Sequence, residues 1–522
     1  MRIWHKNFNG KNEDWIYLGL PIAISVIIKL ILLTALYNTL FNNDATIYIN
    51  AAKQYAMGNF TNGLAIYPMP AYPMLLALVH LLIPDWILAG YFISIISMIL
   101  VTIPLYFLTK IMFDNKVAFW TCIVFAVIPQ VNEWSLSIIR EPLFLLLFIS
   151  SVYFALRSIL EKDFLLFGTT FIFSWLATLI RIEGVVFIGF YFFVLSYLSI
   201  SDKKNRAGFF IRLLTWVGIP LGIISLVLLF NGLQGIAFSR FDNVYDELIK
   251  FFSGGFLIKS SRISAALSEM APHRPFHDGH YSFLVLCKHY MPLIYALGVM
   301  QAIVKILFFS SFIPLYFGLK DRANCSGNSG KFILWILILF AGLAYYVLII
   351  EDYMATRWAM IPAILLLPWI GSGINILFAK ANASSHKKLI LFLILIIVFA
   401  PTIKTFGLIS SRDITTAYTL KWLKENNKIN KVQIVSNNFK ESFYFDLAVQ
   451  SQTDSNSKIY FYNKRKIKKS IEEFSLEKNA SIIIFKVKTN EKGKIPNFHL
   501  YQKATSIVGN RYSTFIYCKV QE

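Results

Sequence analysis

Charged residues are scarce in this sequence. Only 15% of its 522 residues are charged and 56% are hydrophobic, whereas charged residues make up about 25% of a soluble globular protein. Apolar runs of about 20 residues recur along the chain, and this is the length that crosses a bilayer as a helix. The composition therefore excludes a soluble protein and indicates a polytopic membrane protein.

Two kinds of binding motif are also missing. None of the four cysteines belongs to a C-x-x-C pair, which argues against a zinc knuckle. The C-terminal part lacks a glycine-rich phosphate loop, so nucleotide binding is not expected. The net charge of +21 has sources other than nucleic-acid binding, namely cytoplasmic loops and the C-terminal part, and we expect no nucleic-acid partner.

The apolar runs predict about eleven transmembrane helices. The first is too long for a signal-peptide core and has no small-residue cleavage site, so we interpret it as retained. The predicted spans lie near residues 15–41, 86–109, 115–131, 139–160, 164–180, 183–200, 207–230, 291–319, 332–350, 357–378 and 389–408.

The charge distribution between these spans predicts their orientation. Seventeen Lys and Arg residues fall in the segments on the N-terminal side of the membrane, against four in the short segments on the other side. Because cytoplasmic loops carry the excess of positive charge, we expect a cytoplasmic N-terminus and an extracytoplasmic C-terminal domain. We expect a multi-pass protein of the plasma or inner membrane.

Two domains are predicted. Residues 1–408 form the membrane domain, with outer loops at 42–85 and 231–290, and residues 409–522 alternate between strands and helices, which is typical of a small α/β domain. The expected strands are 432–436, 458–462, 481–487 and 514–520, and the expected helices are 416–426, 442–449 and 467–478. This domain has a net charge of +10, which suits either a solvated surface or one that faces anionic headgroups.

Charged residues of four outer segments converge on one face of the membrane. Charges at membrane level are costly and usually mark a functional site, so this convergence points to function. The residues are Asp44, Arg140, Glu141, Arg181, Glu183, Glu351, Asp352 and Arg357.

Each of these residues also has a structural interpretation. Asp44 suits a helix N-cap. Glu141 precedes Pro142, and both residues are favoured in a first helical turn, with Arg140 as an ion partner for the carboxylate.

The later outer residues have similar alternatives. Arg181 and Glu183 flank a turn and suit a surface pair, whereas Arg357 suits a side chain that extends from a span to the interface. Lys305 falls in the outer half of its predicted span, where it can reach a lipid phosphate.

The outer loop 231–290 ends in a histidine-rich segment. Three functions remain open for it: a divalent metal site, contacts to a phosphate or a sugar hydroxyl, and a solvated loop. A metal would involve His277, Asp278 and His280, and the substrate contacts would add His273 and Arg274.

A series of motifs along residues 15–410 resembles a known family. An aspartate follows the first span, and a loop with Gly58, Tyr67-Pro68 and Tyr72-Pro73 comes next. The further members of the series are Pro129, Arg140-Glu141-Pro142, Leu179-Ile180-Arg181-Ile182-Glu183-Gly184 and Arg357-Trp358-Ala359-Met360-Ile361-Pro362. The order and spacing resemble GT-C fold glycosyltransferases, especially the branch of protein mannosyltransferases and aminoarabinose transferases.

The resemblance implies transfer of a sugar from a polyprenyl-phosphate donor on the outer face of the membrane. It gives Asp44 the catalytic or acceptor-positioning role, Glu141 the second acidic position and Arg357 a basic position near the donor. The chain departs from many relatives because Ala45 follows Asp44, where they have an acidic pair. It also lacks the W-W-D-Y-G motif of oligosaccharyltransferases, which argues against whole-glycan transfer to asparagine.

The chemistry suits these residues. A carboxylate takes the proton of the acceptor hydroxyl and cations stabilise the leaving phosphate, so direct displacement predicts inversion at the anomeric carbon. Asp44 is the candidate base, and Tyr48, Tyr67 and Glu183 are candidate substrate contacts. The candidate phosphate ligands are Arg140, Arg181, Lys305 and Arg357.

The expected partners are a polyprenyl-phosphate sugar, membrane lipids and a glycan, lipid or protein acceptor. Three alternatives stay open: a transporter or flippase of lipid-linked glycans, a ligase or polymerase, and an inactive scaffold. Transporters usually have functional charges near the midplane, whereas these charges gather at the outer face.

Overall fold

The computed structural model describes residues 11–36, 44–234, 249, 253–270, 283–320, 327–411, 433–436, 458–461, 471–478, 482–488, 498–505 and 512–519. The chain divides into two compact units. The first comprises Met1–Lys29, Ala51–Ser135 and Ile139–Thr405, and the second comprises Leu30–Asn50, Leu136–Ile138 and Phe406–Glu522. The sequence analysis placed the domain boundary at residue 408. It did not assign Leu30–Asn50 and Leu136–Ile138 to the second unit.

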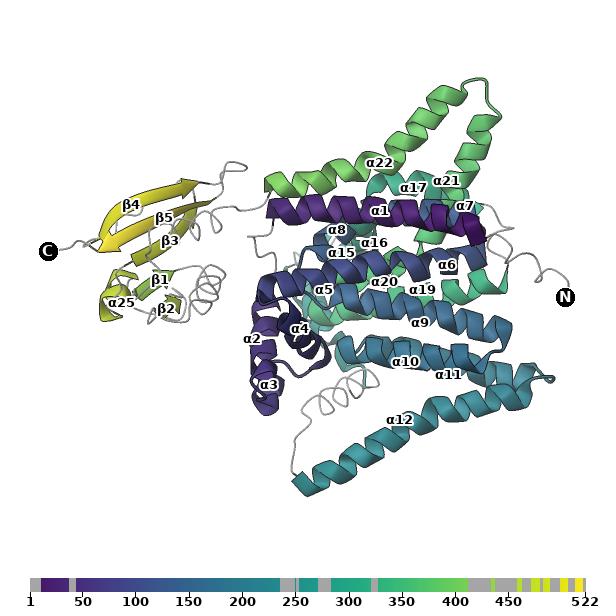
Figure 1. The fold of residues 1–522 in the computed structure, drawn as a ribbon, viewed down its shortest axis with the longest axis horizontal. Helices are drawn as coiled ribbons and strands as arrows, with labels where there is room; N and C mark the ends of the chain where they lie inside the picture. The colour runs from purple at the N-terminus through teal and green to yellow at the C-terminus, as the bar shows by residue number, and fades with distance from the viewer. Residues whose placement is uncertain are drawn as a thin grey trace, which may run out of the picture. The chain divides into compact units, whose positions relative to one another are not determined.

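Helices form nearly all of the described chain up to residue 411 (Figure 1). In the first half they are α1 Lys11–Leu36, α2 Asp44–Ala56, α3 Phe60–Ile66, α4 Ala71–Leu82, α5 Trp86–Leu100, α6 Thr102–Met112, α7 Asn115–Val127, α8 Pro129–Ser135, α9 Glu141–Glu161, α10 Phe164–Ile180, α11 Gly184–Ser201 and α12 Arg206–Gln234.

The second half contains shorter and more often broken helices. They are η1 Gly255–Leu257, α14 Ile258–Met270, α15 Phe283–His289, α16 Met291–Leu307, η2 Phe309–Ser311, α17 Phe312–Lys320, α19 Asn328–Glu351, η3 Thr356–Ala359, α20 Met360–Leu365, α21 Leu367–Asn382 and α22 Lys387–Ser411.

Many of these helices suit a bilayer, and the chain is a multi-pass membrane protein. Six described helices are long and apolar enough to cross it, and the number rises to nine if each of three bent helix pairs counts as one span. The bends are 62° between α7 and α8, 97° between α16 and the helix after it, and 48° at the α20–α21 break. The total of eleven transmembrane helices stays a prediction. The two predicted spans beyond these nine, 164–180 and 207–230, correspond to helices α10 and α12.

Aspartates cap the N-termini of three described helices through their side chains. Asp85, Asp114 and Asp163 precede α5, α7 and α10, and each carboxylate accepts backbone N–H groups of the first turn. These bonds satisfy donors that have no partner within the helix. The start of each helix is therefore fixed by a polar residue outside the apolar run.

The helices α9, α10 and α11 lie side by side in the first unit (Figure 1). Aromatic rings fill the space around them: the Phe148 ring lies 5.6 Å from that of Phe187 and 4.8 Å from that of Phe340 in α19. Such edge-to-face pairs add to the apolar contact. This packing holds the turns between the helices, which carry the charged residues that the sequence analysis expects at the outer face.

A buried lysine lies at the break between α7 and α8. Lys29 of α1 is fully buried, and its ammonium donates to Ser25 Oγ over 2.8 Å and to Asn132 Oδ1 over 3.1 Å. The amide of Asn132 donates to the carbonyls of Ala126 and Ile128, each over 3.0 Å. Through Asn132, Lys29 thus joins α1 to backbone carbonyls at the helix break, a role that the sequence did not indicate.

The second unit contains a five-stranded sheet in the order β2-β1-β3-β5-β4. Its strands are β1 Gln433–Ser436, β2 Lys458–Phe461, β3 Ile482–Lys488, β4 Phe498–Thr505 and β5 Tyr512–Lys519, and helix α25 spans Ile471–Glu477. The strands β2, β1 and β3 run parallel, and β3, β5 and β4 run antiparallel. Four of these strands were predicted and β4 was not; the expected helices 416–426 and 442–449 lie outside the described residues.

Candidate active site

The charged residues predicted on the outer face come from turns and helix ends. Glu141 is the first residue of α9, Arg181 ends α10, and Glu183 precedes α11. Arg357 lies in the 3₁₀ turn η3. Because α9 and α10 form an antiparallel hairpin, the start of α9 and the end of α10 meet.

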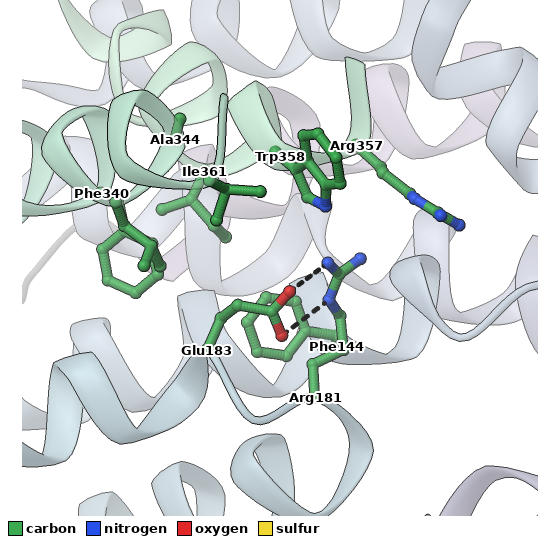
Figure 2. A pocket seen from close by; sticks show the side chains of 10 residues that line it. Phe144, Arg181, Glu183, Phe340, Ala344, Arg357, Trp358 and Ile361 are labelled. Atoms are coloured by element: carbon green, nitrogen blue, oxygen red, sulfur yellow. Dashed lines mark hydrogen bonds and ion pairs between the residues drawn. The ribbon is translucent and has the colours of Figure 1, made fainter. Parts of the chain in front are cut away.

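Arg181 holds two carboxylates together. Its Nη1 donates to Glu141 Oε1 over 2.6 Å, and its Nε donates to Glu183 Oε2 over 3.2 Å. A second bond joins its Nη2 to Glu183 Oε1. Figure 2 shows the two guanidinium nitrogens of Arg181 facing the two oxygens of the Glu183 carboxylate. Arg181 is 3% exposed and Glu141 is 1% exposed. The interpretation of Arg181 and Glu183 as a surface pair is therefore wrong for Arg181.

Glu141 also faces a second guanidinium. Its Oε1 lies 3.9 Å from Nη1 of Arg357, a side chain that is 36% exposed. Its other oxygen, Oε2, is buried and has no hydrogen-bond partner within the described part of the chain. The adjacent Arg140, which the sequence suggested as the partner of Glu141, instead donates from Nη1 to Ile180 O over 3.3 Å and to Met69 Sδ over 3.2 Å.

Arg140 connects the cluster to the first outer loop. Its guanidinium carbon lies 5.7 Å from the centre of the Tyr67 ring, within the range of a cation–π contact. Tyr67 ends helix α3, so the Tyr-Pro bend of this loop lies against α9. The resulting arginine–glutamate cluster consists of Arg140, Glu141, Arg181, Glu183 and Arg357.

The charges of this cluster do not balance. Among the described residues the cluster combines three guanidinium groups with two carboxylates, a formal sum of +1. Glu183 stays ionised: burial opposes its charge, but Arg181 and then Arg140 lower its pKa to about 2. A site with an excess of arginine at membrane level is suited to an anion, above all to a phosphate that accepts forked bonds.

A pocket opens beside the cluster (Figure 2). The volume that a water-sized molecule can enter is small, about 20 Å³. Arg181, Glu183 and Arg357 line its polar side, and its apolar wall consists of Phe144, Phe340, Leu343, Ala344, Val347, Trp358 and Ile361. The pocket thus combines charge with an apolar surface, as an amphiphilic ligand requires.

The other candidate residues lie elsewhere. Asp44 begins helix α2, is half-buried, and belongs with Tyr48 to the second unit. Lys305 is exposed in the last turn of α16, and no described ion pair joins it to the cluster. The histidine-rich segment with His273, Arg274, His277, Asp278 and His280 lies outside the described residues.

The described residues contain no group of three or more His, Cys, Asp or Glu side chains arranged for a metal ion.

Two features of the arginine–glutamate cluster could not be predicted from the sequence. The Glu141–Arg181 bond joins residues that lie 40 positions apart, and the apolar wall comes largely from α19 and η3.

Residues 67–229 match the family described as dolichyl-phosphate-mannose-protein mannosyltransferase. This region contains Tyr67, Arg140, Glu141, Arg181 and Glu183, whereas Asp44, Lys305 and Arg357 lie outside it. No curated protein sequence matches the chain significantly.

Two solved structures align with most of this chain, and the first of them supports a similar fold. The apo oligosaccharyltransferase of Archaeoglobus fulgidus is 13% identical, with a TM-score of 0.50 over 99% of this chain and 75% of that one. ArnT from Cupriavidus metallidurans in the apo state is 10% identical, with a TM-score of 0.48 over 96% of this chain and 97% of that one.

The family match and the fold together support a membrane glycosyltransferase in general. The similarity to an oligosaccharyltransferase concerns the fold alone, because the sequence lacks the W-W-D-Y-G motif. The resemblance to GT-C fold glycosyltransferases that depend on polyprenyl-phosphate sugars is thereby confirmed.

Proposed function

We propose that this protein transfers a sugar from a polyprenyl-phosphate donor to a lipid, glycan or protein acceptor at the outer face of the plasma or inner membrane. The observation that carries the proposal is the arginine–glutamate cluster with its excess positive charge, next to a pocket with an apolar wall. A polyprenyl phosphate has the matching chemistry, since it joins an anionic group to a hydrocarbon chain.

The arginines have different roles in this proposal. Arg181 already makes bonds to Glu141 and Glu183, so it positions the carboxylates. Arg357 is more exposed, lines the pocket and lies 3.9 Å from Glu141. We therefore assign the donor phosphate to Arg357, whose charge stabilises the leaving phosphate in the transition state.

The transfer is a direct displacement at the anomeric carbon. The acceptor oxygen forms the new bond to that carbon, the bond to the phosphate oxygen breaks, and the polyprenyl phosphate leaves with the electron pair. Asp44 accepts the proton of the acceptor hydroxyl. This role rests on its position in the motif series and on its half-buried place at the start of α2. Attack opposite the leaving group gives inversion.

Glu141 is the second acidic residue in this scheme. Its Oε1 accepts from Arg181 and faces Arg357. Its contribution is to hold both guanidinium groups in place, so removing its charge displaces the phosphate ligand rather than the base. Asp44→Asn and Glu141→Gln consequently impair different steps.

A transfer assay in membranes tests the proposal. Wild type, Asp44→Asn and Glu141→Gln receive a panel of radiolabelled polyprenyl-phosphate sugars, and Glu161→Gln serves as a control because its carboxylate pairs with Arg157 on an exposed part of α9. We expect transfer by wild type and the control, near-complete loss in Asp44→Asn, and inverted stereochemistry in the product. Equal transfer by Asp44→Asn would exclude this residue as the base.

Absence of transfer from every donor, with folded protein, would contradict the function. A vesicle assay then separates the alternatives, because a flippase moves the lipid-linked sugar between leaflets without breaking its phosphate bond. A ligase or polymerase transfers an entire glycan from a lipid diphosphate, which the same panel detects when such donors are included.

A further inference from the structure

A second polar pocket lies at the ends of α10 and α11 remote from the arginine–glutamate cluster. Its lining includes Lys162, Lys204, Asn205, Gly208 and Arg212, and the volume that a water-sized molecule can enter is about 240 Å³. Helix α10 has 17 residues and is therefore about 25 Å long. This basic pocket and the arginine–glutamate cluster thus lie at opposite ends of one helix hairpin, and the predicted topology places the basic pocket at the cytoplasmic face.

The carboxylates near the basic pocket are already engaged. Asp202 accepts from Lys162 Nζ over 2.8 Å and from the side chain of Asn205. Asp163 accepts from the first backbone N–H groups of α10, and Glu161 pairs with Arg157. No carboxylate lines the pocket. The positive charges of Lys204 and Arg212 are therefore in excess there.

Arg212 is a buried cation that forms no ion pair with a described residue; the carboxylate of Asp163 acts on it only from a longer distance. Its side chain is 5% exposed. Its Nη1 donates to Ser158 O over 3.2 Å and its Nη2 donates to Lys162 O over 2.5 Å. Its Nε is buried and has no partner among the residues that the structure describes. These hydrogen bonds of the buried guanidinium all go to backbone carbonyls, and its guanidinium carbon lies 5.3 Å from the centre of the Phe209 ring. A buried charge without an ion pair is costly and favours a nearby anion.

The surroundings indicate what kind of anion approaches. Helix α12 exposes a run of large apolar side chains beside the basic pocket: Phe210 is 51%, Ile211 54% and Leu214 56% exposed. Such a face contacts acyl chains in a membrane, which places lipid headgroups at the level of Lys204. A basic pocket between membrane helices on this side is suited to an anionic headgroup.

We propose that the basic pocket binds a phosphate group, supplied by an anionic phospholipid of the inner leaflet. Lys204 and Lys162 contact the phosphate, and the buried positive charge of Arg212 attracts it electrostatically. The acyl chains lie along the apolar face of α12. The site is separate from sugar transfer and does not depend on the proposed function. Its occupancy fixes the α11–α12 turn at the membrane surface.

Native mass spectrometry of the purified full-length protein tests this site. The probe is a short-chain phosphatidylglycerol, with phosphatidylcholine of equal chain length as the zwitterionic control. In Gly208→Leu the added side chain enters open space, since nothing lies within 4 Å of its Cβ, and it fills the pocket without changing the charge. We expect this variant to lose the bound phosphatidylglycerol.

Charge is tested separately with neighbouring lysines. Lys204→Gln removes a lining residue, whereas Lys203→Gln makes the same charge change at a position that does not line the pocket. We expect binding to weaken about fivefold in Lys204→Gln and much less in Lys203→Gln. Thermal unfolding at the wild-type temperature shows that each variant is folded.

The outcomes separate the sources of the phosphate. If only other anionic lipids displace phosphatidylglycerol, the phosphate belongs to a lipid headgroup, as proposed. If inorganic phosphate binds with equal affinity, the pocket binds phosphate but its ligand is the free ion, and the lipid part of the proposal is wrong. Equal binding by Gly208→Leu, Lys204→Gln and Lys203→Gln, or equal binding of phosphatidylcholine by wild type, would overturn the proposal.

Discussion

Arg181 Nη1 lies 2.6 Å from Glu141 Oε1, and both side chains are almost completely buried. Glu141 begins α9 and Arg181 ends α10, so the bond closes the end of this hairpin that lies opposite the α9–α10 turn. Without Arg181, the buried Glu141 would keep only Arg357 at 3.9 Å, so the pair has consequences for stability as well as for function.

Replacement of Arg181 alone should destabilise the protein strongly. Arg181→Met leaves Glu141 buried without its main partner, and breaking such a pair typically costs about 3–5 kcal/mol. We expect a lower thermal unfolding temperature in detergent. The double variant Glu141→Gln/Arg181→Met removes both charges and should recover part of the loss. Equal stability of the single variant and wild type would show that the pair adds nothing to folding.

Replacement of Arg357 should impair transfer more than stability. Its side chain is 36% exposed, so its removal leaves no cavity in the packed interior. We expect Arg357→Ala to lose about 10²–10³-fold in rate, and Arg357→Lys to restore only part of it because an ammonium cannot donate the same fork. Lys331→Ala, at the opposite end of α19, is the control for a lost surface charge.

Glu183 should make the stability depend on pH in the acid range. Its pKa in the folded protein is about 2, below the ordinary value of about 4.3 in an unfolded chain. A depressed pKa contributes stability that is fully present above the unfolded value and is lost as the pH falls through the folded value. Unfolding measured between about pH 5 and pH 2 should therefore show a decline that Glu183→Gln reduces.

The control for this measurement is Glu351→Gln, which makes the same chemical change at an exposed position. If the decline with pH were identical in wild type and Glu183→Gln, the carboxylate would not be held by Arg181 as the structure has it.

Two glycines allow a direct test of the helix packing. A Cβ on Gly373 of α21 would lie 1.7 Å from the carbonyl oxygen of Pro314, so Gly373→Ala must separate α17 from α21. We expect a loss of about 1–3 kcal/mol. Gly342→Ala in α19 meets nothing within 4 Å and should not destabilise. Similar unfolding temperatures of the two variants would contradict this close approach.

Much of the fold followed from the apolar runs, because a bilayer span needs both length and uniform hydrophobicity. The bends did not follow. The α16 helix, for example, ends at Phe308, which has a φ of 66°, within a predicted continuous span.

Strand β4 was missed for another reason. It is an edge strand with Gln502 and Lys503 in its middle and an irregular register, and polar edge residues weaken the strand pattern.

The charged residues of the site followed from the outer loops, but their pairing did not. The sequence suggested Arg140 as the partner of its neighbour Glu141, whereas the antiparallel packing of α9 and α10 selects Arg181. Neighbours in a helix start point in different directions, so only the tertiary arrangement determines the pair. The apolar wall from Phe340 and Trp358 was likewise beyond prediction because these residues are far along the chain.

The spacing of the Glu141–Arg181 pair also bears on how the protein is made. Its loop closes within 40 residues, and Glu183 follows two positions later, so the hairpin can bring these charges together soon after it leaves the ribosome. Arg357 is synthesised much later. Glu141, Glu183 and Arg181 therefore come together first with a formal charge of −1, and Arg357 joins them only after the later part of the chain has been made.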